Sequence, residues 1–266
     1  MLYIVLSIFA VICLYPVFFT LTSSLKNNTE IFTDPFLVAR TPQLENYVRA
    51  WTIGKMGVYF KNSIILTAAT VFVSAIIGSM ASYILAKYTF KGKSFVYILF
   101  LAGMMIPIQT VIIPLAFTFG KLGIVDNFPV LVLLYSAFCL SMTVFIVTGY
   151  MKGLPDELEE AAVMDGAGHG IVFFRIILPL SMPAIASASI FNFVSAWNNL
   201  LFPLVFISKD SMKTISIGLL SFFGAYTSDY GAVMAAIGVS IIPPIIMYIL
   251  LQEKMEKGLT AGAVKG

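Results

Sequence analysis

The sequence predicts an all-α integral membrane protein with six transmembrane helices that are kinked by prolines. Of its 266 residues, 59% are hydrophobic and only 11% are charged, whereas a soluble domain usually carries about 25% charged residues. Six stretches without Asp, Glu, Lys or Arg are each long enough to cross a bilayer as a helix, which takes roughly 20 apolar residues. Because a water-soluble fold could not bury so much apolar surface, we expect a single transmembrane domain over residues 1–266.

The six predicted spans follow one another with links of very different length. They are Met1–Leu21, Asn62–Ala86, Ser94–Gly120, Asn127–Met151, Ile176–Ser208 and Tyr230–Gln252. The first stretch lacks a basic segment before it and exceeds the roughly 7 to 15 apolar residues of a signal-peptide core, so we expect a retained span. Prolines inside the spans predict kinked or broken helices, since neighbouring helices in a bundle can bond the freed carbonyls. These prolines are Pro107, Pro114, Pro203, Pro243 and Pro244.

The number of Lys and Arg residues in the links does not show which side of the membrane each link occupies. Lys and Arg are divided equally between the two sides that six spans define, so the positive-inside rule gives no answer from the count alone. Three lysines crowd one short link, Lys87, Lys91 and Lys93. This cluster favours a cytoplasmic position for that link, which would place both termini in the cytoplasm.

Several classes of function and site are disfavoured by the composition. A net charge of +3, spread along the chain, offers no basic stripe for nucleic acid. Cys13 and Cys139 lie in apolar runs and do not suggest a disulfide framework. The single histidine, His169, has no partners at a metal-ligand spacing, so we expect a solvated loop residue and no metal site. There is no GxxxxGK[ST] phosphate loop and no catalytic triad, which predicts a non-catalytic chain.

The link between the fourth and fifth spans is the most structured polar segment. From Leu154 to Pro183 it reads LPDELEEAAVMDGAGHGIVFFRIILPLSMP. Pro155 and the acidic residues after it suit the first turn of a helix, and Gly166 and Gly168 can end that helix. A small-residue face is expected from Leu154, Leu158, Ala161 and Ala162, with a turn and a second helix to follow. Periodicity alone is explained equally well by a solvated amphipathic linker.

The residue identities in this link are more specific than its periodicity. Glu160-Ala161-Ala162, Gly166, Ile176, Leu178 and Pro179 stand at the spacing E-A-A, three residues, G, nine residues, I-x-L-P. This pattern resembles the signature loop of binding-protein-dependent ABC transporter permeases. Further similarity to the carbohydrate-uptake branch, specifically its maltose-type second permease subunit, lies in Trp197-Asn198-Asn199, Phe202-Pro203-Leu204 and the ending Gly258–Gly266. The resemblance therefore covers most of the chain.

The resemblance implies a type I ABC importer permease. Residues 152–182 would form the cytoplasmic coupling loop, which contains a coupling helix that binds a separate ATPase. Residues 253–266 would form a cytoplasmic tail, of which Gly258–Gly266 would lie against the ATPase dimer. The coupling residues would be Leu158, Glu160, Ala161, Ala162, Asp165 and Gly166, with Glu160 paired to a basic residue of the ATPase.

The resemblance also implies the assembly and its location. The chain would pair with a second permease subunit as a heterodimer, and with two copies of the ATPase and an extracytoplasmic sugar-binding protein. It would hold no cofactor of its own, because ATP and Mg would be bound by the ATPase. The expected place is the bacterial or archaeal cell membrane, with several spans and cytoplasmic termini.

A row of polar residues in the predicted fifth span could line a sugar pathway. Ser189, Asn192, Ser195 and Asn199 recur at steps of three, three and four, with Trp197 and Asn198 beside them. Amides that both donate and accept, together with an aromatic plane, suit hydroxylated solutes. Gln109, next to Pro107, is a weaker candidate. Equally, small and amide residues can hold helices together in lipid, and Trp197 is as consistent with packing as with recognition.

Other transport mechanisms and other solutes remain as alternatives. An ion-coupled secondary transporter or channel usually carries charged residues inside its spans, and the six predicted spans contain none. An intramembrane enzyme lacks a catalytic cluster, and a purely structural protein leaves the E-A-A segment unexplained. The solute of an ATP-driven importer could also be a polyol or a peptide-like molecule.

Overall fold

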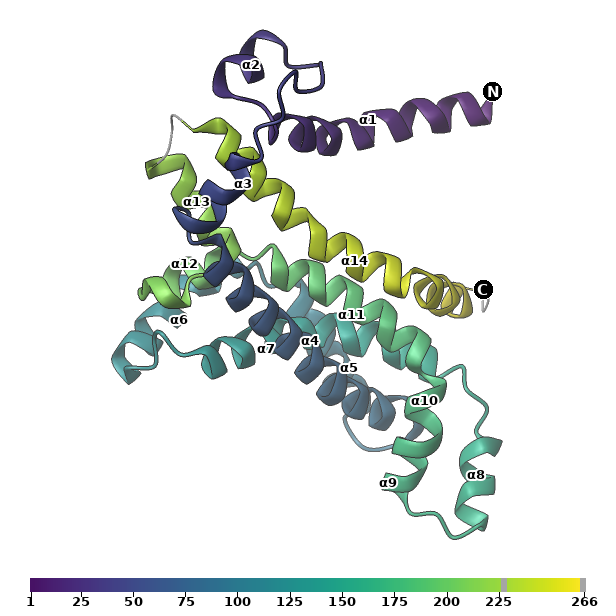
Figure 1. Cartoon of the computed structure of the whole chain (residues 1–266). Coiled ribbons are helices and arrows are strands. Elements are labelled where there is room, and N and C mark those ends of the chain that lie inside the picture. Colours follow the sequence, from purple (N-terminus) through teal and green to yellow (C-terminus); the bar gives the residue numbers. More distant parts are fainter. Residues whose placement is uncertain (226–228, 264–266) are drawn as a thin grey trace. The chain divides into compact units, whose positions relative to one another are not determined.

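The computed structural model describes residues 1–225 and 229–263, and every regular element among them is a helix (Figure 1). The chain divides into two compact units. Unit 1 is Met1–Ser63 with Lys209–Pro243, and unit 2 is Ile64–Ser208 with Pro244–Gly266. Helices α4 (Met56–Lys87) and α14 (Tyr230–Ala263) continue from one unit into the other. Each unit is described by itself below.

Unit 1 contains the first helix and short elements around two links. Its elements are α1 (Leu2–Ser23), α2 (Asn28–Thr33), α3 (Glu45–Thr52), the start of α4, the 3-10 helix η2 (Asp210–Met212), α13 (Ile215–Ala225) and the start of α14. Asp210 ties η2 to the start of α4 by accepting from Lys55 Nζ at 2.6 Å, Tyr59 Oη at 2.9 Å and Lys213 Nζ at 3.0 Å. Lys55, together with Lys213 and Tyr59, holds the pKa of the Asp210 carboxyl well below its usual range.

Unit 2 contains the rest of α4 and the helices that carry the candidate sites. They are α5 (Lys93–Met105), α6 (Ile108–Leu122), α7 (Phe128–Met151), α8 (Glu157–Met164), α9 (His169–Val172), the π-helix η1 (Phe173–Ile177), α10 (Leu178–Leu180), α11 (Met182–Trp197) and α12 (Leu201–Phe206). Helix α7 packs against both α5 and α11. It therefore forms the centre of this unit.

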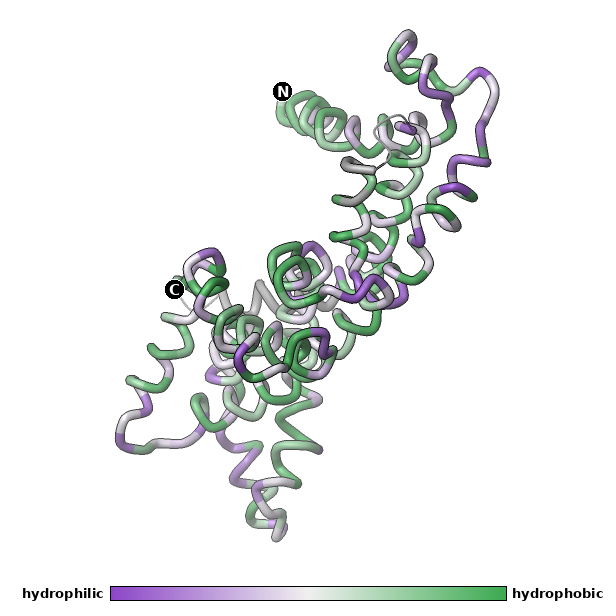
Figure 2. The backbone as a smooth tube through the Cα atoms, turned by 90° about the vertical axis from the view of Figure 1, so that its left-hand side faces the viewer, coloured by the Kyte–Doolittle hydropathy of each residue, from purple (hydrophilic) through white to green (hydrophobic). Residues whose placement is uncertain are grey.

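The predicted fold class is confirmed. Among the described residues, four helices are long and apolar enough to cross a membrane: α1, α4, α7 and Tyr230–Glu253 of α14. Two bent pairs raise the number to six if each pair is one span, namely α5 with α6, bent by 95°, and His169–Leu180 with Met182–Trp197, bent by 72°. Figure 2 shows that the long helices are mostly hydrophobic and that hydrophilic residues gather in the links.

The third and fifth predicted spans are both broken beside prolines. Only the break in the third span lies at a proline that was expected to cause one. The third span breaks at Pro107, which caps α6, while Pro114 lies within α6. The fifth span was predicted as one segment through Ser208, but α11 ends at Trp197 and Pro203 lies in the separate helix α12. Its bend falls at Ser181, between Pro179 and Pro183. Neither of these prolines was among those expected to break a span, because both lie near the start of the predicted fifth span.

Two helices extend past the predicted spans at charged residues, although the last candidate span, Tyr230–Glu253, agrees with the predicted Tyr230–Gln252. Helix α4 includes Lys61 and Lys87, because a lysine near a helix end can direct its ammonium away from the apolar region. Helix α14 continues through Ala263, so most of the predicted tail 253–266 is helical backbone. Residues 264–266 of that tail lie outside the described residues.

Helices α4 and α7 approach each other closely at Gly78. A Cβ placed on Gly78 would lie 2.5 Å from Thr143 Cγ2 and 2.8 Å from Thr143 Cβ. Thr143 also accepts a hydrogen bond from the Asn192 side chain of α11 at 2.8 Å. Since lipid supplies no hydrophobic force between helices, such small residues and polar contacts set the packing of α4, α7 and α11.

We expect Gly78→Ala to destabilise the protein because its methyl group would displace Thr143. Overpacking of this kind costs about 1 to 3 kcal/mol, which should lower the thermal unfolding midpoint measured by fluorescence-detected size exclusion. The matched control is Gly149→Ala on α7, where a Cβ meets nothing within 4 Å. Equal midpoints for the two variants would contradict the close approach at Gly78.

Candidate functional site

The 152–182 loop folds as two helical arms joined by a turn at Gly166 (Figure 1). Helix α8 begins at Glu157, after Pro155, and carries three acidic residues in its first turn. It ends in a Schellman motif: Gly166 donates to Val163 O and Ala167 donates to Ala162 O, both at 2.9 Å. Gly166 has φ +82°, which favours glycine. The E-A-A-x-x-x-G spacing thus places a glycine where the helix must stop.

The six residues assigned to coupling do not share one environment. Ala162 is buried against Met151, Val172 and Phe173 in a core cluster of unit 2. Leu158, Glu160, Ala161, Asp165 and Gly166 are exposed. The prediction that Leu154, Leu158, Ala161 and Ala162 form one face is therefore wrong. Leu154 lies before α8 and packs against the same core as Ala162, whereas Leu158 and Ala161 point outward.

The outward side of the loop combines apolar and acidic side chains. Four apolar residues are exposed there, with Met164 at 86% the most exposed: Leu158, Val163, Met164 and Ile171. Glu157, Glu160 and Asp165 are exposed on the same two arms. Water-exposed apolar side chains of this number on a short loop are typical of a surface that a protein partner covers.

Lys87, at the end of α4, attaches the start of the loop. Its Nζ donates to Leu154 O and to Asp156 Oδ1, each at 2.6 Å. The Lys87 side chain is only 4% exposed, although that of Asp156 is 80% exposed. The hydrogen bond and charge of Lys87 hold the pKa of the Asp156 carboxyl below its usual value. Sequence analysis used Lys87 only as a member of the lysine cluster in its link. It did not predict that Lys87 attaches the start of the loop.

Two tyrosines attach both arms of the loop. The Tyr83 hydroxyl donates to Glu159 Oε2 at 3.1 Å and lies 3.2 Å from the Tyr88 hydroxyl. The Tyr88 hydroxyl lies 2.8 Å from His169 Nδ1. His169 was expected to be a solvated loop residue. It is exposed, but it is also hydrogen bonded and in edge-to-face contact with Tyr88. The sequence offered no sign of this because the partners are far apart in number.

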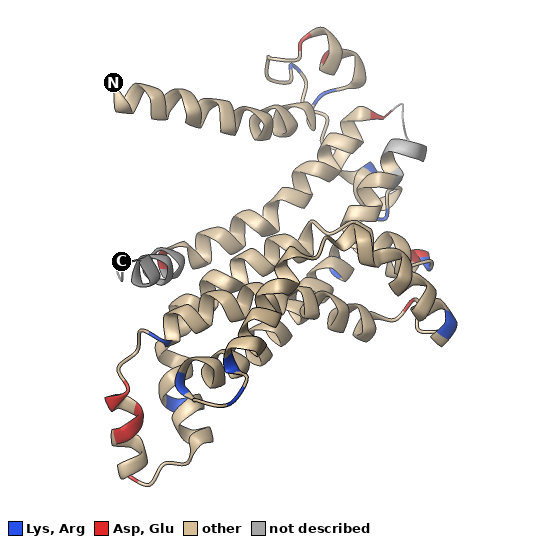
Figure 3. Cartoon of the chain, turned by 180° about the vertical axis from the view of Figure 1, so that it is seen from behind, with Lys and Arg blue, Asp and Glu red and all other residues tan. Residues whose placement is uncertain are grey.

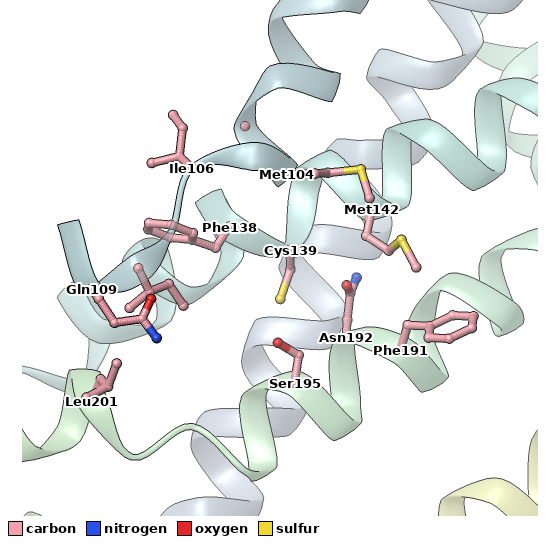
Figure 4. A pocket seen from close by; sticks show the side chains of 12 residues that line it. Met104, Ile106, Gln109, Phe138, Cys139, Met142, Phe191, Asn192, Ser195 and Leu201 are labelled. Atoms are coloured by element: carbon pink, nitrogen blue, oxygen red, sulfur yellow. The ribbon is translucent and has the colours of Figure 1, made fainter. Parts of the chain in front are cut away.

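A second candidate site is a cavity of about 480 Å³ in unit 2 (Figure 4). Its walls come from the end of α5, the start of α6 and Ile106 between them, and from α7, α11 and Leu201 of α12. Three of the predicted pathway residues line it together: Gln109, Asn192 and Ser195. Apolar side chains complete the wall, including Met104, Phe138, Met142 and Phe191. Sequence reasoning missed these four, because single apolar residues in a span carry no distinguishing signal.

The remaining pathway candidates have other surroundings. Trp197 is buried and stacks on Phe193, with ring centroids 5.9 Å apart and planes 8° apart. Asn199 accepts from the Phe202 N–H at 3.1 Å and so caps α12. Ser189 is half-buried and Asn198 is exposed, and neither is among the residues that line the cavity.

Asn192 serves packing as well as the cavity. Its side chain is 3% exposed and donates to Thr143 Oγ1 at 2.8 Å and to Ser74 Oγ at 3.4 Å. It thereby links α11 to α7 and α4. Asn192 therefore fits both interpretations of the polar row, since it lines the cavity and also holds helices together. Within residues 1–225 and 229–263, no group of three His, Cys, Asp or Glu residues lies close enough to hold a metal ion.

We expect Lys87→Met to loosen the start of the loop, because it removes both hydrogen bonds and keeps the aliphatic stem. Amide hydrogen exchange in residues 153–160 should become about tenfold faster, the effect of losing a charge-assisted contact at a partly solvated site. Lys91→Met, in the same link but exposed, is the control. Unchanged exchange in the Lys87 variant would show that this lysine does not restrain the loop.

The same contact should resist mild acid. Because the folded pKa of Asp156 is lowered, the contact is present above the ordinary carboxyl pKa and is lost only as pH falls through the lowered value. Exchange in residues 153–160, corrected for its intrinsic pH dependence, should therefore stay constant from about pH 8 to about pH 5. A loss of protection within this window would contradict the assigned contact.

Known proteins resemble this chain over most of its length. The family model described as the inner membrane component of binding-protein-dependent transport systems matches residues 74–261. The diacetylchitobiose uptake system permease protein NgcG of Streptomyces coelicolor is 33% identical over 262 residues, covering 98% of this chain and 87% of that protein. The trehalose/maltose transport system permease protein MalG of Thermococcus litoralis is 36% identical over 261 residues, covering 97% and 93%.

One solved structure shares the fold. A chain in the crystal structure of a bacterial ABC transporter involved in the import of the acidic polysaccharide alginate superposes with a TM-score of 0.81. The two chains are 24% identical, and the match covers 95% of this chain and 94% of the other. The two chains therefore share one fold over nearly their whole length.

Proposed function

Since the chain belongs to the family of inner membrane components of binding-protein-dependent transport systems, we propose that it forms half of the pathway for a sugar or oligosaccharide and couples to a separate ATPase through the 152–182 loop. Family membership confirms the expected resemblance and makes the chain the non-catalytic permease subunit of an ABC importer. The observation that carries the proposal is the ordered loop with its outward apolar and acidic surface.

The loop would face the cytoplasm, with both termini on the same side. Positive residues of unit 2 gather at the end from which the loop projects, as Figure 3 shows around the acidic α8. These residues are Lys87, Lys91, Lys93, Lys152 and Arg175. Such gathering at one end, rather than the total count, is what the positive-inside rule would use.

The exposed surface of α8 suits a groove on an ATPase subunit. Glu160 is free to pair with a basic residue, and Ala161 is small enough to allow a close approach. Leu158 and Met164 would supply apolar contact. Closure of two ATPase subunits on ATP would push the loop, and the helical segment 169–180 would pass this displacement to the bend at Ser181 and to α11.

Sugar or oligosaccharide uptake is supported by the cavity and by the relatives. The cavity offers the Gln109 amide and the Ser195 hydroxyl among apolar walls, and no charged residue is among those that line it. This suits an uncharged hydroxylated solute. One relative is named for the uptake of diacetylchitobiose. Others are named for the transport of starch degradation products, of arabinooligosaccharides, or of trehalose and maltose.

The assembly would contain a second permease subunit, in a heterodimer, with two ATPase copies and an extracytoplasmic sugar-binding protein. A binding-protein-dependent importer implies each kind of partner. The most apolar stretch of α1 has no buried residue within this chain. This stretch therefore needs lipid or another subunit around it.

We expect Glu160→Lys in the reconstituted complex to reduce both retention of the ATPase and binding-protein-stimulated ATP hydrolysis, by about tenfold or more. A lysine at this position would repel the basic residue of the ATPase. Like charges that meet in a desolvated interface cost several kcal/mol of binding free energy, and about 1.4 kcal/mol already corresponds to a tenfold loss of affinity. Stimulation would be assayed with a panel of diacetylchitobiose, trehalose, maltose and longer malto-oligosaccharides. The control is Glu45→Lys, an exposed charge reversal in α3 of unit 1.

The result separates a coupling element from a linker. Loss of retention in Glu160→Lys, with the two permease subunits still assembled and Glu45→Lys unchanged, supports the proposed coupling. If the ATPase is retained and stimulated as in the wild type, the loop is only a linker and the proposed coupling is wrong.

The cavity predicts different outcomes for two of its polar residues. Gln109→Ala should reduce uptake of the sugar that stimulates ATP hydrolysis by about fivefold without changing the thermal midpoint, since it removes one exposed hydrogen-bonding group. Asn192→Leu should instead reduce the free energy of unfolding by about 1 to 3 kcal/mol, because Thr143 and Ser74 lose their buried partner. The thermal midpoint should therefore fall. Normal uptake in Gln109→Ala for every sugar in the panel would argue against this cavity as part of the pathway.

A further inference from the structure

We propose that Tyr83, Tyr88, Glu159 and His169, together the tyrosine network, position the coupling helix α8, and that His169 acts in it as a hydrogen-bond donor through Nδ1. The inference rests on the proposed coupling role of the loop. It assigns a function to the lone histidine and to Glu159, the glutamate next to Glu160.

The tyrosine network joins three separate parts of unit 2. Tyr83 lies in the last turns of α4, Tyr88 directly follows that helix, Glu159 lies in α8 and His169 begins α9. The distances run 2.8 Å from His169 Nδ1 to Tyr88 Oη, 3.2 Å from there to Tyr83 Oη, and 3.1 Å to Glu159 Oε2. Both arms of the loop are thus attached to the end of one long helix.

Counting protons gives the network a direction. A tyrosine hydroxyl has one proton to donate, and that of Tyr83 is donated to the Glu159 carboxylate. The contact between the tyrosines then requires Tyr88 to donate to Tyr83. Tyr88 has no second proton for His169, so the 2.8 Å contact requires a proton on Nδ1. All three hydrogen bonds are made only if His169 donates.

Packing supports a positioning role. Tyr83 is 4% exposed and belongs to the same core cluster as Ala162, Val172 and Phe173. Its ring is edge-to-face with Tyr88 at 5.4 Å and lies 5.2 Å from Phe173. Glu159 is half-buried, whereas its neighbour Glu160 is exposed. With Glu159 bound on the inner side, the helical rotation of about 100° per residue turns Glu160 outward.

The groove around His169 contains the charged groups that bear on its proton. Lys87 and Tyr88 face it from the end of α4 and the residue that follows, and Glu159 and Glu160 face it from α8; Val163, Met164 and Val172 supply its apolar walls. The groove that holds position 169 is therefore lined by two carboxylates and by Lys87, whose ammonium is already bonded to Asp156 and Leu154.

The test uses the complete transporter in nanodiscs and three variants, two at position 169 and one at position 88. His169→Asn keeps an N–H donor near the place of Nδ1, His169→Asp offers only acceptors while ionised, and Tyr88→Phe removes one hydroxyl. We expect exchange of the α8 amides to be near wild type in the Asn variant and about fivefold faster in the Asp and Phe variants. Tyr150→Phe, which packs against the same core cluster, is the control.

A pH profile distinguishes a donor from a mere space-filling residue. A protonated aspartic acid regains an O–H donor, so exchange of α8 in His169→Asp, divided by the wild-type value at each pH, should return toward one as pH falls below about 5. Identical exchange in the Asn and Asp variants at pH 8, or an Asp variant without this recovery, overturns the donor role.

The outcome is separable from that of the proposed function. If Glu160→Lys releases the ATPase but Tyr88→Phe and His169→Asp leave α8 exchange and ATPase affinity unchanged, the loop couples and the network does not position it. If Glu160→Lys retains the ATPase, the coupling proposal fails whatever the network does. Faster α8 exchange with a weaker ATPase affinity in His169→Asp and Tyr88→Phe, and near wild-type values in His169→Asn, support both.

Discussion

Close approach of α4, α7 and α11 is the constraint on which the rest of unit 2 depends. Lipid tails are as apolar as the side chains of a span, so burial alone does not hold membrane helices together. Gly78 lets α7 approach α4, and Thr143 fills the space a larger residue would take. Asn192 then hydrogen bonds to both neighbours, at Thr143 and Ser74. Three helices are thereby fixed by one glycine and a few polar atoms.

Both candidate sites inherit their geometry from this packing. Toward one end, the last turn of α4 supplies Lys87 and Tyr83, which attach the start of the loop and α8. In the middle, the same faces of α7 and α11 that pack through Asn192 also line the cavity. Since α11 begins at the bend that follows the loop, a displacement of the loop reaches the cavity wall through one helix. In the proposed function, coupling and solute passage would therefore share this helix.

Sequence reasoning reached the features that local chemistry determines. Charge-free stretches located the spans because a charge in hydrocarbon is costly. Gly166 and Gly168 were both predicted as residues that can end α8, and Gly166 does so with φ +82°. The Pro107 break followed from the missing N–H of proline. The bend at Ser181 did not, since it depends on how two flanking prolines pack against neighbouring helices.

The contacts that sequence reasoning missed are long-range. Lys87 and Asp156, or Tyr83 and Glu159, are more than sixty positions apart, and no periodicity connects them. The same limit explains the mixed outcome for the polar row of α11. Helical spacing placed Asn192 and Ser195 on one side, as found, but it could not tell that Trp197 stacks on Phe193 or that Asn199 caps α12.

A division of labour between adjacent residues follows from these contacts. Glu159 and Ala162 face the protein and hold α8 in place, while Glu160 and Ala161 face outward between them. A short helix of eight residues has little stability of its own. Its outward residues can keep a fixed orientation only if the inward ones are bonded to something longer. The long helix α4 provides that support, which is why the E-A-A segment needs the tyrosines that lie far before it.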